Sequence, residues 1–260
     1  MDRLLQPGDP APFGIENEAG ASPFVFACDH AGRAVPARLG DLGLPEAELS
    51  RHIGWDIGIH GVTRALARAL DAPYVFQPYS RLVIDCNRRP GHAQSIAPVS
   101  DTTLVPANAD LSPAEVRARQ SEILEPYHAA LARLFDARRA AGRPTLFVAM
   151  HSCTDRLRSN GIARPWEIGV LADRDWRFGD ALIAVLESET NFTVGRNQPY
   201  TVSAETDYTV PVHAEGRGLP YAEIEIRQDL IGDPAGQAEW AALCGRLFPL
   251  AAERSGVLAP

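Results

Sequence analysis

Two histidines follow apolar segments that are typical of β-strands in this chain of 260 residues. His30 comes shortly after residues 24–28, and His151 comes directly after residues 145–150. Ligands of open α/β sheets bind beyond the carboxyl ends of the strands, so we expect the two imidazoles to lie near one another. Catalytic zinc sites use three protein ligands and keep one position open for water. The two histidines therefore indicate a metal centre that needs a third ligand.

Two residues compete for the third position, His52 and Asp56. Both fall in a helical pattern predicted over residues 45–70, where a spacing of four places them on one face. We favour Asp56, because a carboxylate lowers the net positive charge of a metal bound by two histidines. The predicted ligands are then His30, Asp56 and His151. Zinc is the first candidate, and iron, manganese and cobalt are also compatible with this donor set.

Metal-dependent hydrolysis also needs a group that moves protons. A bound metal lowers the pKa of its water to about 7, and a carboxylate can take that proton and pass it to the leaving nitrogen. Glu223 and Glu225 lie in a strand predicted over residues 222–226. We expect only one of them to face the site. We choose Glu225, which is nearer the carboxyl end, and expect Glu223 to face the other layer.

Arginines supply groups that can hold a substrate. Arg81 and Arg88 flank a strand predicted over residues 82–86, and Arg227 follows the strand that carries Glu225. The guanidinium fork matches a carboxylate in bidentate geometry. The arrangement predicts a clamp for an acidic amino acid.

Short apolar runs alternate with longer helical patterns along the chain, which favours an α/β fold. We expect a single domain over residues 1–260, with a mixed sheet flanked by helices. Further strands are predicted near residues 74–77 and 168–172. Helices are predicted at 112–141, 175–189 and 237–252, the first with a Ser112–Glu115 capping pattern and a bend at Pro126. Residues 88–111 read as a long irregular loop.

The composition excludes several classes of partner. A formal net charge of −8 gives no basic field for nucleic acid or an anionic membrane. No stretch approaches the roughly 18–20 apolar residues that a membrane span needs. No signal peptide is visible, and the four cysteines form no paired motif, so we expect a cytoplasmic protein. The sequence carries no signal for the oligomeric state.

Five segments resemble the N-formylglutamate amidohydrolase family, in the order that the family shows. They are Cys-Asp-His-Ala-Gly-Arg-Ala-Val-Pro (28–36), His-Ile-Gly-Trp-Asp-Ile-Gly (52–58), Tyr-Ser-Arg-Leu-Val-Ile-Asp-Cys-Asn-Arg (79–88), His-Ser (151–152) and Glu-Ile-Arg-Gln-Asp-Leu-Ile (225–231). The segments at 79–88 and 225–231 are the most specific. Together the five span residues 28–231, most of the length of the chain.

The resemblance implies a fold like that of the zinc-dependent exopeptidases, of the phosphorylase/hydrolase-like type, and cleavage of an N-acyl amide by a metal-activated water. It implies the roles already given to the metal ligands and to Glu225. It adds Asn87 to the arginines that face the substrate. It also places His213 where it would stabilise the developing oxyanion or hold the substrate.

The leading hypothesis is a zinc-dependent hydrolase of linear amides, with N-formyl-L-glutamate as first substrate. The nearest alternative is the same chemistry on a larger amide, such as a peptidoglycan fragment. A cysteine hydrolase using Cys28 or Cys153, and a protein that binds acidic ligands without turnover, are alternatives from other classes.

Overall fold

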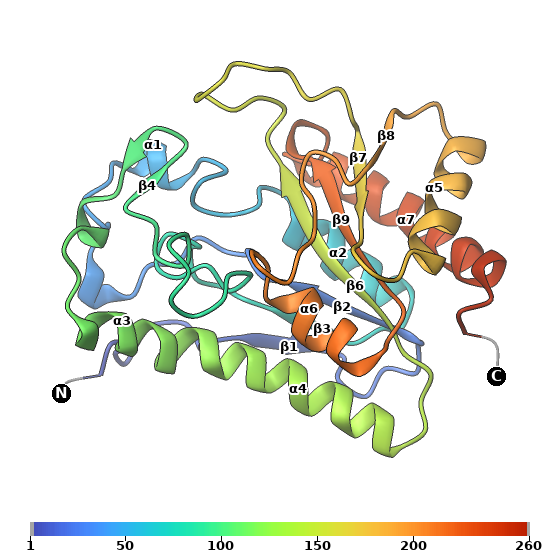
Figure 1. Ribbon diagram of the computed structural model, residues 1–260, viewed down its shortest axis with the longest axis horizontal. Helices are drawn as coiled ribbons and strands as arrows, with labels where there is room; N and C mark the ends of the chain where they lie inside the picture. The colour runs from blue at the N-terminus through green and yellow to red at the C-terminus, as the bar shows by residue number, and fades with distance from the viewer. Residues whose placement is uncertain (1–2, 259–260) are drawn as a thin grey trace.

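A mixed sheet of seven strands forms the centre of the computed structural model, which describes residues 3–258 (Figure 1). The strand order is β1-β3-β2-β6-β9-β7-β8. Strands β3, β2, β6 and β9 run parallel, whereas β1 and β7 run antiparallel to β3 and β9. The bounds are β1 (Gly14–Glu16), β2 (Phe24–Cys28), β3 (Tyr74–Phe76), β6 (Leu146–Cys153), β7 (Ile168–Leu171), β8 (Val194–Arg196) and β9 (Tyr221–Arg227).

Helices cover both faces of the sheet. One face packs against α2 (Ile59–Ala69), α5 (Arg177–Glu189) and α7 (Pro234–Ser255). The other packs against α4 (Glu125–Ala140) and α6 (Thr209–His213), with α3 (Pro113–Arg119) before α4 and α1 (Glu46–Leu49) further away (Figure 1). Alternation along the strands separates the two cores, since Val148 faces the first set of helices and Ala149 the second. The predicted α/β fold with a mixed sheet is confirmed.

Short elements complete the fold. A separate hairpin pairs β4 (Val99–Ser100) with β5 (Thr103–Leu104), inside the predicted loop of residues 88–111. The 3₁₀ turns are Ala37–Leu39, Pro106–Asn108, Glu215–Arg217 and Gln228–Leu230. Within residues 3–258, no helix combines the length and apolar character needed to cross a membrane. The assignment of residues 1–260 to one domain stays a prediction.

The helix predicted from Ser112 begins as expected. Ser112 Oγ accepts from the backbone N–H of Glu115, and the Glu115 carboxylate accepts from the N–H of Ser112 at 2.8 Å. A π-helical turn at Gln120–Leu124 then joins α3 to α4, and Pro126 lies in the first turn of α4. The sequence predicts a bend or break at Pro126, and the regular α-helix is interrupted by the π-helical turn directly before this proline. Proline has no backbone N–H to donate to a continuous helical ladder.

The continuous helix predicted over residues 45–70 is wrong. Residues 50–58 between α1 and α2 are irregular, and the backbone N–H of Asp56 donates to the His30 carbonyl at 3.0 Å. Gly58 has a φ of +80°, and a Cβ there would lie 2.0 Å from the carbonyl oxygen of Ile231. Gly58 is the N-cap of α2, so this close approach to a segment far along the chain delays the start of the helix to Ile59.

The strand predicted over residues 82–86 is also absent. The segment is buried but irregular, so its carbonyls need partners from outside a sheet. Three buried side chains donate to them: Asn108 Nδ2 at 2.8 Å, Arg119 Nη1 at 2.9 Å and His128 Nε2 at 2.8 Å. An apolar run indicated burial correctly and the backbone conformation wrongly.

Candidate metal centre and active site

Three buried side chains converge at the carboxyl edge of the parallel strands. His30 follows β2, His151 lies within the neighbouring strand β6, and Asp56 comes from the irregular segment before α2. One donor atom from each lies within 4.8 Å of the others. Asp56 Oδ2 is 2.9 Å from His151 Nδ1 and 3.3 Å from His30 Nδ1. The described residues therefore bring together the donors predicted from the sequence.

His52, the competing candidate, points elsewhere. Its Nε2 lies 3.4 Å from Asp101 Oδ2, and its ring lines a neighbouring cavity. The convergent donor set contains Asp56 instead. The preferred residue is therefore placed as expected, although not by the helical geometry that suggested it.

A second carboxylate lies behind each imidazole. His30 Nε2 is 2.8 Å from Asp85 Oδ1, and His151 Nε2 is 3.3 Å from Asp29 Oδ2. Both rings thus present Nδ1 to the centre and Nε2 to a carboxylate. Metal-bound histidines in proteins are commonly oriented in this way. Sequence analysis missed Asp29 and Asp85, although the need for an acceptor behind each metal-bound histidine is a signal that could have found them.

The electrostatics of the cluster favour positive charge at its centre. Burial lowers the pKa of His151, but Asp29 and Asp56 outweigh it and raise that pKa well above its usual value. Burial raises the pKa of Asp56, but His30 and His151 outweigh it and hold that pKa well below its usual range. Surroundings that stabilise a protonated imidazole also stabilise a cation at the same nitrogen atoms. The donor set therefore fits a divalent metal ion.

A cavity of about 490 Å³ opens beside the cluster, and both candidate glutamates line it. In the parallel pairing of β6 with β9, His151 lies opposite Glu225 and Ala149 opposite Glu223. The expectation that only one glutamate faces the site is wrong, because residues two apart on a strand share a face. Burial raises the pKa of both carboxyls to about 8. One oxygen of each, Oε2, has no hydrogen-bond partner among the described residues.

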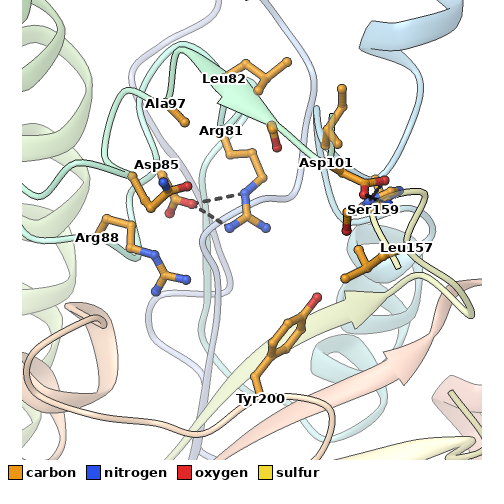
Figure 2. Close-up of a pocket in the computed structure, with 13 residues that line it drawn as sticks. Arg81, Leu82, Asp85, Arg88, Ala97, Asp101, Leu157, Ser159 and Tyr200 are labelled. Atoms are coloured by element: carbon orange, nitrogen blue, oxygen red, sulfur yellow. Dashed lines mark hydrogen bonds and ion pairs between the residues drawn. The ribbon is translucent and has the colours of Figure 1, made fainter. Parts of the chain in front are cut away.

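Arg81, Asn87 and Arg88 also line this cavity. Arg81 donates from Nε and Nη2 to Asp85 Oδ2, at 3.1 and 2.6 Å, which fixes its guanidinium next to the cluster (Figure 2). Arg88 is ion-paired with Asp207. These contacts hold both guanidinium groups at the cavity wall.

Arg227 is not among the residues that line the cavity. Its Nε donates to Asp229 Oδ1 at 2.8 Å, and its Nη1 lies 3.4 Å from the carbonyls of Arg164 and Pro165. The predicted contact with substrate is not supported, because a nearer acceptor two residues along the chain holds the guanidinium. Arg164, which sequence analysis missed, lowers the pKa of Glu225 against the opposing effect of burial.

His213 likewise lies outside the cavity lining. Its Nε2 is 3.0 Å from His128 Nδ1, and the two rings stack with centroids 5.2 Å apart. Burial, His128 and Arg217 lower its pKa to about 3. The predicted role at the oxyanion is not supported by this position, because α6 points the ring into the core.

Fold and site together define an α/β protein with a buried two-histidine, one-carboxylate donor set beside a cavity lined by glutamates and arginines. The model of the N-formylglutamate amidohydrolase family matches residues 22–232, and the chain belongs to this family. No curated protein sequence matches it significantly.

Two solved structures are similar over nearly the whole chain. A gene product of Agrobacterium tumefaciens has 36% sequence identity and a TM-score of 0.93, covering 97% of this chain and 99% of that one. An N-formylglutamate amidohydrolase from Ralstonia eutropha has 21% identity and a TM-score of 0.70, covering 96% and 98%. The second likeness concerns the fold alone.

Proposed function

We propose that this protein is a metal-dependent hydrolase of the N-acyl amide of a small amino acid. The observation that carries the proposal is the convergence of both Nδ1 atoms and the Asp56 carboxylate beside a glutamate-lined cavity. His30, Asp56 and His151 would hold the metal, with zinc as first candidate. The chemistry supplied there by a bound metal would be polarisation of the acyl carbonyl and a lowered pKa of a water molecule.

Glu225 is the proposed proton carrier. It lies opposite His151 across two paired strands, and its Oε2 is buried without a hydrogen-bond partner among the described residues. Burial raises the pKa of its carboxyl, which brings its proton affinity closer to that of a metal-activated water. In the proposed reaction, Glu225 takes a proton from the attacking water and gives it to the amide nitrogen. The C–N bond breaks, leaving a carboxylic acid and the free amino acid.

Arg81 and Arg88 would bind a carboxylate of the substrate. Each has a guanidinium at the wall of the cavity, and Arg81 Nη1 is 3.6 Å from Asp56 Oδ1, close to the proposed metal. Asn87 adds an amide: its Oδ1 accepts from two backbone N–H groups, which leaves Nδ2 for the cavity. N-formyl-L-glutamate, an acidic amino acid derivative, is the first substrate to test.

The cysteine alternative is disfavoured by burial. Cys28 and Cys153 are both buried, and burial raises the pKa of each thiol well above its usual value. A thiolate nucleophile needs the opposite shift.

The test is to purify the protein, determine its metal content, and follow release of formate from N-formyl-L-glutamate. We expect activity that a chelator removes and that zinc restores. An active preparation without metal would contradict the mechanism. Binding of the substrate without turnover, at full metal occupancy, would favour a ligand-binding protein.

A further inference from the structure

The two carboxylates behind the imidazoles of the proposed metal centre are held in different ways. Asp85, behind His30, has several donors. Arg81 Nε and Nη2 donate to Asp85 Oδ2 at 3.1 and 2.6 Å (Figure 2). The backbone N–H of Asn87 donates to Asp85 Oδ1 at 2.9 Å. A charged, two-point contact and a backbone donor together fix the plane of this carboxylate.

Asp29, behind His151, has much less support. Its Oδ2 lies 3.3 Å from His151 Nε2, and neither atom has any other hydrogen-bond partner among the described residues. Its Oδ1 accepts from Thr209 Oγ1 at 2.7 Å. All three side chains are buried. Rotation of the carboxylate about its Cβ–Cγ bond would take Oδ2 away from the ring, and the hydrogen bond from Thr209 opposes that rotation.

Tyr127 on α4 is another neighbour of Asp29. Burial and, after it, the nearby Asp29 raise the pKa of the Tyr127 phenol well above its usual value. The Tyr127 hydroxyl forms no hydrogen bond among the described residues, whereas the hydroxyl of Thr209 lies at a normal hydrogen-bonding distance from Asp29. The support of the Asp29 carboxylate therefore depends mainly on Thr209.

The backbone of Thr209 has a separate contact on the substrate side of the site. Thr209 is the first residue of α6, and the first N–H groups of a helix have no partner within the helix. The N–H of Thr209 donates to Asn87 Oδ1 at 3.1 Å, and Asn87 lines the cavity. A substitution of the Thr209 side chain removes the contact with Asp29 and keeps the contact with Asn87. The two contacts can therefore be tested separately.

We propose that Thr209 is a positioning residue of the metal centre, whose hydroxyl directs the Asp29 carboxylate toward His151 Nε2 and so directs His151 Nδ1 toward the metal. The inference rests on the proposed function, because it requires a metal at His30, Asp56 and His151. Hydrogen bonds behind a metal ligand set the orientation of its ring and thereby the affinity for the metal. Thr209 is fully buried and does not line the cavity, so its side chain acts on metal binding rather than on the substrate.

The experiment measures the zinc affinity of the metal-free protein by competition with a chromophoric chelator. We expect Thr209→Val to weaken zinc binding by about three- to tenfold, the scale of one buried hydrogen bond. Thr209→Ser keeps the hydroxyl and should restore the affinity. At saturating zinc, the KM for N-formyl-L-glutamate should stay within about twofold of the wild-type value, because the N–H to Asn87 remains.

Thr63→Val is the matched control. Thr63 is also fully buried, but its hydroxyl donates to the carbonyl of Ile59 within α2, at 2.8 Å. Its zinc affinity should equal that of the wild type. Thermal unfolding checks that each variant is folded, and Thr209→Ala, which removes the same hydroxyl, replaces Thr209→Val if the latter does not fold.

A double variant tests whether Thr209 acts through Asp29. Added to Asp29→Ala, Thr209→Val should weaken zinc binding no further, because no carboxylate is left to orient. An equal further loss in that background would overturn the proposed route. If the wild-type protein binds no zinc, the proposed function itself fails. If the wild type binds zinc and Thr209→Val binds it equally well, only the role of Thr209 is overturned.

Discussion

Two pairs of buried histidines differ in what surrounds their nitrogen atoms. The rings of His30 and His151 have centroids 5.1 Å apart, and those of His128 and His213 are 5.2 Å apart. In the first pair every ring nitrogen lies against a carboxylate. In the second pair the nitrogens contact one another, a backbone carbonyl and Arg217.

The hydrogen bonds of the second pair run in one direction. A carbonyl can only accept, so His128 Nε2 must donate to Cys86, and His128 Nδ1 must then accept from His213 Nε2. His213 Nδ1 in turn accepts from Arg217 at 3.4 Å. Both rings are neutral in this chain. Two similarly buried pairs therefore differ in their electrostatics: carboxylates at the first pair favour a cation, whereas the ring nitrogens of the second pair contact no carboxylate among the described residues.

Removing the central carboxylate should have the largest effect. Asp56→Ala leaves two imidazoles without the shared anion, so we expect loss of bound metal and a fall in kcat/KM of about 10³-fold or more. Metal analysis measures the loss of bound metal, and the rate of formate release measures the fall in kcat/KM. Asp180→Ala, on the surface of α5, serves as control. An Asp56→Ala protein with full metal and full activity would exclude this cluster as the active centre.

Glu225→Gln should lower kcat by about 10²–10⁴-fold while the metal content stays at the wild-type level, because a carboxamide cannot carry the proton. Steady-state kinetics on protein of known metal content separate the two effects. Glu223→Gln is the matched comparison, and we expect a smaller loss since Glu223 pairs with Ala149 rather than with His151. A larger loss of kcat for Glu223→Gln than for Glu225→Gln would assign the proton transfer to Glu223 instead.

Removing a carboxylate behind an imidazole ring should have a smaller effect on metal binding than removing Asp56. Asp85→Asn and Asp29→Asn each keep the shape of the side chain but remove the anion that orients one imidazole. We expect metal affinity to fall by about 10–100-fold for each, measured by competition with a chromophoric chelator. Unchanged affinity in both variants would show that Asp85 and Asp29 do not orient the ligands.

The smallest effect concerns the second pair and depends on pH. The pKa of His213 is lowered to about 3 in the folded protein and is near 6.5 when unfolded. Between these values the unfolded chain binds more protons, so His213 makes stability fall as the pH drops below about 6.5. His213→Gln should remove this contribution, about 1.4 kcal/mol per pH unit, without changing metal affinity. Urea unfolding at pH 7 and pH 5 measures it. A tenfold loss of metal affinity in His213→Gln would instead show that the second histidine pair supports the metal site.

Much of the site could be predicted from residue types at the ends of strands. His30 and His151 follow or end apolar runs, and Glu225 lies on a strand that pairs with the strand of His151. The capping pattern at Ser112 gave a correct helix start, because it depends only on neighbouring residues. These features are local, so a single sequence contains them.

The parts of the fold and of the site that could not be predicted depend on contacts between segments far apart in the sequence. Asp56 is positioned by the His30 carbonyl and by the close approach of Gly58 to Ile231, which no local pattern reveals. Residues 82–86 are irregular because Arg119 and His128 satisfy their carbonyls from α3 and α4. Arg227 contacts Asp229 and His213 contacts His128, and neither residue lines the cavity; the contact of His213 joins segments far apart in the sequence.

The most direct test of the central claim is anomalous diffraction from crystals of the protein supplied with zinc. The account predicts one strong peak bonded to Nδ1 of His30, Nδ1 of His151 and the carboxylate of Asp56. A peak at His52 and Asp101, a peak between His128 and His213, or bonding through Nε2 of either ligand histidine would contradict it.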